Sequence, residues 1–133
     1  MTPRDSADAL NLTTTAQSLR AHARGLYSAE AAAEILINHA AWLHRSDFAS
    51  QFVQTSNIDG TDLATVDWQA AIAALDAGRL PCSGGERRIL RVAASLAEGI
   101  PVDLRDALTG IDSRNIGILL KALPHASGRR PTG

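Results

Sequence analysis

Cysteine, lysine and long apolar segments are nearly missing from this chain, and each shortage excludes something. A single cysteine, Cys82, excludes a disulfide within the chain. No apolar run approaches the ~20 residues that a helix needs to cross a bilayer, and the polar residues 1–6 lack the apolar core of a signal peptide. We therefore expect a cytoplasmic protein that makes no membrane contact.

An excess of charge of either sign is missing as well. The chain has 13 basic and 14 acidic residues and a formal net charge of −1, whereas a dedicated nucleic-acid binder usually carries a strong basic excess. Only Lys121 is a lysine, and the other basic residues are arginines. This bias, with the abundance of alanine, indicates a bacterial gene of high GC content. Any binding of nucleic acid would have to rely on a local basic patch.

Aromatic residues are scarce too, at 4% of the chain, while 45% of its residues are hydrophobic. Alanine is the commonest residue; it has the highest helix propensity and lets helices approach closely. We therefore predict an all-α fold, a compact bundle of about six short-to-medium helices. A length of 133 residues suits one domain. Residues 1–12 are expected to form a flexible N-terminal arm, residues 13–123 the helical domain, and residues 124–133 a flexible basic tail.

Apolar spacing predicts the helices of the first two thirds of the chain. The strongest pattern covers residues 29–45, where apolar side chains recur at helical spacing around much of the circumference, which predicts one central helix. Shorter helices are expected over residues 14–24, 46–53 and 62–77. Gln54–Thr61 predicts a loop, since Asn57, Asp59 and Gly60 are turn residues. No segment predicts a strand.

The last third of the chain has start and stop signals for three helices. Ser83 and Glu86 have the spacing of a capping box, and Gly99 followed by Pro101 stops the helix that they start. A short helix is expected over residues 102–109. A last helix is expected over residues 113–123, with Pro124 ending it.

Residues 102–123 have roughly the size and spacing of a helix-turn-helix. Gly110, Ile116 and Leu119 fit the turn and the second helix, although Ala107 lies three residues before Gly110 where four is usual. The residues that would contact DNA are Ser113, Arg114, Asn115, Gly117 and Lys121. These types suit groove and phosphate contacts. The alternative is a corner of a bundle in which Arg114 is an exposed first-turn residue whose replacement leaves stability nearly unchanged.

The turn at residues 82–88 is a second candidate, for an anion or another small ligand. Its residues are Ser83, Gly84, Gly85, Arg87 and Arg88. Glycines at a helix start expose backbone N–H groups, and arginines there call for a nearby anion. The alternative is a capped helix with a solvated arginine face, in which Glu86 supplies the negative charge. Cys82 beside this helix start is expected either to have a lowered pKa or to be a small residue in a turn.

The sequence contains no recognisable catalytic or metal-binding pattern. His39 and His44 are five residues apart and do not share a helix face, so His39 is expected to be a hydrogen-bonded core or boundary residue. We therefore predict no cofactor, no metal and no enzymatic activity. The function expected is interaction with a protein partner or with a second copy of the chain; the alternatives are a small DNA-binding regulator and a binder of anions or small ligands.

Overall fold

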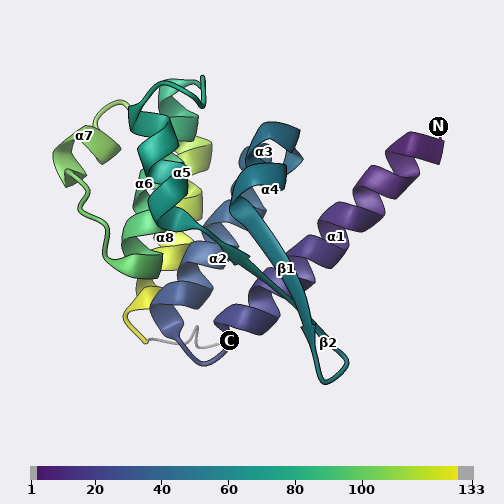
Figure 1. The fold of residues 1–133 in the computed structure, drawn as a ribbon. Helices are drawn as coiled ribbons and strands as arrows, with labels where there is room; N and C mark the ends of the chain where they lie inside the picture. The colour runs from purple at the N-terminus through teal and green to yellow at the C-terminus, as the bar shows by residue number, and fades with distance from the viewer. Residues whose placement is uncertain (1–2, 129–133) are drawn as a thin grey trace.

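The computed structural model describes residues 3–128, with side chains from residue 12 onwards. It has a mainly helical fold with one small β-hairpin (Figure 1). In chain order the elements are α1 (Pro3–Ala23), α2 (Tyr27–His39), α3 (Ala41–His44), α4 (Ser46–Phe52), β1 (Val53–Ile58), β2 (Thr61–Val66), α5 (Trp68–Asp76), α6 (Gly84–Glu98), α7 (Leu104–Leu108) and α8 (Ser113–Ala126).

The helix α2 lies at the centre of the molecule. It has α1 on one side and α6 and α8 on the other (Figure 1). Ala31, Ala32 and Ile35 of α2 are fully buried, as are Ile89 and Ala93 of α6. Because alanine side chains occupy several of these contact points, the helices can pack closely against one another with few aromatic residues in the core.

The prediction of one continuous helix over residues 29–45 is wrong. The helix begins at Tyr27 without a side-chain cap and ends at His39, because Ala40 adopts a positive φ of 71°. A positive φ is unfavourable for alanine, so the surrounding packing has to impose it. The break turns α3 so that Trp42 is fully buried and its indole N–H donates a hydrogen bond to the backbone oxygen of Glu86 at 2.9 Å.

The segment predicted as a loop is a β-hairpin, so the fold is mainly helical and not all-α. β1 and β2 pair antiparallel, with Val53 opposite Val66. Asp59 and Gly60 form the two-residue turn with φ values of 52° and 83°, as a turn between paired strands requires. Past Val53 the residues of β1 are exposed on both faces, whereas β2 buries Ala64 and packs against α1.

Both ends of the chain also differ from the prediction. The expected flexible arm is helical from Pro3 onwards, since α1 runs from there to Ala23 and buries Leu19 against the core. At the other end α8 continues to Ala126 with Pro124 inside its last turn. A proline near a helix end removes only one backbone hydrogen bond. Residues 129–133 of the predicted basic tail lie outside the described residues.

The predicted start and stop signals of the C-terminal third are confirmed except for Pro124, which lies inside α8 and does not end it. Ser83 and Glu86 form a reciprocal capping box at the start of α6. Gly99 ends α6 in the left-handed conformation at φ 70°, and Gly110 takes φ 75° in the turn before α8. Glycine adopts this conformation without strain, which fixes the turns on either side of α7.

Candidate functional site

The segment that resembles a helix-turn-helix is built from two short-range caps and one long-range contact. Asp103 accepts a hydrogen bond from the backbone N–H of Arg105 at 3.0 Å and caps α7. Asp112 accepts from the backbone N–H of Asn115 at 2.7 Å and caps α8. The guanidinium of Arg88 on α6 donates to the backbone oxygen of Asp106 at 3.1 Å, which holds α7 against α6. The two caps therefore fix where α7 and α8 begin, and the Arg88 hydrogen bond fixes the position of α7 against α6.

Arg114, the first predicted base-reading residue, contacts the C-terminal end of α2. Its guanidinium donates to the backbone oxygens of Asn38 at 3.3 Å and His39 at 3.4 Å. The last carbonyls of a helix lack partners within the helix and carry partial negative charge, so a cation there is stabilising. These contacts count against the expectation that replacing Arg114 leaves stability nearly unchanged.

Asn115, the second predicted base-reading residue, is 4% exposed and lies in the interior. A Cβ atom built on Gly85 would lie 3.1 Å from its Nδ2 atom, so Asn115 packs against the first turn of α6. The two sites predicted separately, at residues 82–88 and in α8, thus touch each other. Asn115 fills space between two helix starts and has no surface to offer to a DNA groove.

The other three predicted DNA-contacting residues lie at the surface of α8. Ser113 and Lys121 are exposed, and Gly117 is half-buried. A Cβ atom built on Gly117 would meet nothing within 4 Å, and its φ is not positive. Nothing inside the described part of the molecule therefore requires glycine at position 117.

The outward side of α8 is apolar, a feature that the sequence analysis did not single out. Leu120 is 64% exposed and Leu123 is 46% exposed, and Ile116 beside them is half-buried. We call Ile116, Gly117, Leu120 and Leu123 the α8 outer face. Residues spaced three and four apart lie on one side of a helix, so the sequence already indicated this exposed apolar side. It lies next to the buried side of α8, which includes Leu119.

The turn at residues 82–88 supplies its own anion. The Glu86 carboxylate accepts from the backbone N–H of Ser83 at 3.0 Å, and the Ser83 hydroxyl accepts from the backbone N–H of Glu86 at 3.1 Å. The hydrogen bond from the Ser83 backbone holds the pKa of Glu86 below its ordinary value. Negative charge thus already sits at the positive end of α6. Arg87 is exposed, while the Arg88 side chain donates its hydrogen bond to the backbone of α7.

Of the two alternatives for Cys82, the structure favours the small, partly buried residue in a turn over the thiol with a lowered pKa. The thiol is half-buried. Burial raises the pKa of Cys82, and the nearby Glu86 carboxylate adds to the rise, which outweighs the opposing effect of Arg45 and Arg87. The thiol is therefore protonated at neutral pH and is a weak nucleophile.

His39 is buried, as predicted, but among the described residues its imidazole lacks the hydrogen bond that was expected of it. The residue is 6% exposed, and its Nδ1 atom has no partner within the described structure. Burial, followed by the positive charge of Arg114, lowers the pKa of His39 below its ordinary value. The imidazole is therefore neutral at physiological pH.

Within residues described by the structure, no three His, Cys, Asp or Glu side chains gather closely enough to hold a metal ion. None of the helices in the same part of the chain combines the length and apolarity needed to cross a bilayer. No protein-family model, no curated protein and no solved structure matches the chain.

Proposed function

We propose that this is a non-catalytic helical protein that acts through protein–protein contact, and that its partner is a second copy of the same chain bound through the α8 outer face. The observation that carries the proposal is the pairing of Gly117 with the exposed leucines 120 and 123 on one side of α8. Exposed large apolar side chains that cluster on one face are typical of interaction surfaces.

Gly117 lowers the stability of α8 in the isolated chain, and a partner helix packed against α8 would account for the presence of a glycine there. Glycine inside a helix destabilises it by about 1 kcal/mol relative to alanine. Neither the backbone conformation of Gly117 nor any neighbour within 4 Å of its built Cβ demands it. Small residues allow two helices to approach closely. A glycine that no described part of the monomer requires therefore fits a second helix packed over it.

The sequence of α8 is complementary to itself in an antiparallel arrangement. If two copies cross at Leu120, Leu123 of each copy lies over Gly117 of the other, because these positions are equally spaced from Leu120. Ser113 and Ser127, both exposed, then meet at the two ends. A two-fold axis requires such self-complementarity of one patch. A large side chain set over a glycine is the usual way in which helices interlock.

DNA binding, the alternative from the sequence, receives less support from the geometry. Arg114 and Asn115 make contacts inside the molecule, so two of the five predicted contact residues are engaged elsewhere. The side of α8 that faces outward presents leucines where a recognition helix presents polar groups. Lys121 remains exposed.

Sedimentation velocity of the purified chain over a range of concentrations tests the proposal. We expect a monomer–dimer equilibrium with a dissociation constant in the micromolar range, because a pair of helices each about 21 Å long buries less than a standard interface. Leu120→Glu should abolish the dimer, since it buries two unpaired carboxylates at the two-fold axis.

Leu104→Glu is the matched control. Leu104 on α7 is 62% exposed against 64% for Leu120, so the same substitution removes a similar apolar surface outside α8. The dimer should persist in this variant. A wild-type chain that stays monomeric at every concentration, or equal dissociation by both substitutions, contradicts pairing through α8. If the wild-type chain is monomeric and instead binds duplex DNA in a salt-dependent manner that Lys121→Ala weakens, the DNA alternative replaces the proposal.

A further inference from the structure

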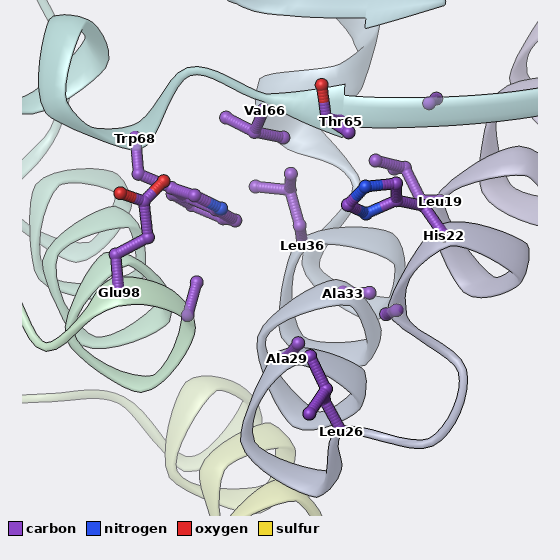
Figure 2. A pocket seen from close by; sticks show the side chains of 13 residues that line it. Leu19, His22, Leu26, Ala29, Ala33, Leu36, Thr65, Val66, Trp68 and Glu98 are labelled. Atoms are coloured by element: carbon purple, nitrogen blue, oxygen red, sulfur yellow. The ribbon is translucent and has the colours of Figure 1, made fainter. Parts of the chain in front are cut away.

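A cavity of about 220 Å³ opens between the end of α1, the start of α2, strand β2, the start of α5 and the end of α6 (Figure 2). Its wall is mostly apolar, and Figure 2 shows Leu36 and Val66 in its middle. An apolar cavity of ~150 Å³ in another protein holds benzene. The larger volume here suits a two-ring aromatic molecule. No residue of α8 lines the cavity, so it is separate from the α8 outer face.

Trp68 presents its aromatic ring at this cavity. The residue is 7% exposed, and its ring extends from the start of α5 into the space between α6 and β2 (Figure 2). The other tryptophan, Trp42, donates its indole N–H to a backbone oxygen at 2.9 Å. The indole N–H of Trp68 makes no hydrogen bond to any described residue. The Trp68 indole nitrogen is not one of the fully buried polar atoms, so its N–H reaches solvent, and what Trp68 offers to an occupant is its aromatic ring.

The end of α6 gives the same place a negative potential. Glu98 is the last residue of α6, and its exposed carboxylate lies beside the Trp68 ring (Figure 2). The last turn of α6 contains no basic residue, although the carbonyl end of a helix favours a cation. Within the described residues Glu98 forms no ion pair. A carboxylate, a helix C-terminus and an aromatic ring all attract positive charge.

We propose that this cavity binds a small two-ring aromatic molecule that carries a protonated amine. The rings lie between Leu36, Val66 and Trp68, and the ammonium group lies against the Glu98 carboxylate. His22 closes the opposite end, where Figure 2 shows its imidazole facing Trp68 across the cavity. This binding is independent of self-association through α8.

Isothermal titration calorimetry of the full chain with tryptamine tests the charge and the shape of the occupant. Tryptamine should bind, and indole-3-propionate, which has the same rings and the opposite charge, should bind at least tenfold more weakly. Glu98→Gln should weaken tryptamine binding at least tenfold. Asp59→Asn is the matched control: it removes one negative charge at the exposed hairpin turn, where asparagine tolerates the positive φ, and it should leave binding unchanged.

A second variant tests the cavity without altering charge. Ala29 lines the cavity and is half-buried on α2, so Ala29→Leu fills the space at a position where a larger side chain has room to reach solvent. It should abolish tryptamine binding while the circular-dichroism melt stays cooperative. The proposal is overturned by no binding up to about 1 mM tryptamine, by equal affinity for the amine and the acid, or by a Glu98→Gln variant that binds as tightly as the wild type.

Discussion

His39 illustrates what burial does to a single side chain in this fold. It lies at the C-terminal end of α2, and the charged groups that act on it are Arg114 of α8, Asp112 at the N-cap of α8 and Glu86 of α6. Burial has the largest effect and lowers the pKa of its imidazole, and Arg114 acts in the same direction. With Nδ1 unpaired, the neutral ring is the form that the core accepts.

This lowered pKa predicts that the folded state loses stability as the pH falls below 6.5. The unfolded chain takes up a proton on His39 near its ordinary pKa of 6.5, whereas the folded chain resists it, so protons favour unfolding. Urea melts between pH 8 and pH 5.5, above the range in which Glu86 titrates, should show this loss. In His39→Gln the pH dependence should be weaker by the His39 contribution. An identical pH dependence in wild type and variant would show that the imidazole titrates freely in the fold.

Arg114 and Asn115 show why residue-level function was only partly predictable. Their types suit DNA contacts, and their position in the first turn of α8 was predicted correctly. Their partners, the carbonyls of Asn38 and His39 and the backbone at Gly85, come from α2 and α6. Spacing along the chain carries no information about contacts with distant segments. From the sequence alone, Arg114 and Asn115 therefore looked available for contact with DNA.

At the scale of the element, α8 has two faces with different tasks. Asn115, Leu119 and Ala122 are buried against the rest of the molecule, while Leu120 and Leu123 are exposed. Gly117 lies beside the exposed leucines and weakens the helix, and no described residue of the chain requires a glycine there. If two copies pair through α8, Gly117 lowers the stability of the monomer and strengthens the dimer, and an experiment can measure these two effects separately.

Gly117→Ala should stabilise the monomer and weaken the dimer. In the Leu120→Glu background, where no dimer forms, alanine should raise Tm by about 3–5 °C, which corresponds to about 1 kcal/mol of helix propensity. In the wild-type background it should weaken self-association about tenfold, because the added methyl group lies beneath Leu123 of the partner. Thermal melts and sedimentation velocity measure the two effects. A rise in Tm with unchanged association would show that no helix packs over position 117.

Elements that are specified locally were predicted well, and those that depend on distant packing were not. The capping box of Ser83 and Glu86 and the left-handed Gly99 are set by neighbours within a few residues. The break at Ala40 has no glycine or proline to announce it and depends on the burial of Trp42. The hairpin had its turn signal in Asp59 and Gly60, but β1 lacks the alternation of buried and exposed residues that marks a strand.

At the scale of the whole molecule, α2 separates the two surfaces that we propose to be functional. The α8 outer face and the cavity beside Trp68 share no residue, and α2 packs between α8 and α1 (Figure 1). Self-association through α8 therefore leaves the cavity open to a ligand. The two proposals consequently fail or succeed separately.

Self-association also links the stability of the fold to protein concentration. Because the dimer contains only folded chains, mass action should raise Tm by about 2 °C for each tenfold rise in concentration above the dissociation constant. Differential scanning calorimetry over two decades of concentration measures this slope. The slope should vanish in Leu120→Glu and persist in Leu104→Glu, whose exposed leucine lies outside α8. A wild-type Tm that does not move with concentration would mean that folding and self-association are not coupled, and the α8 outer face would then have to meet a partner other than this chain.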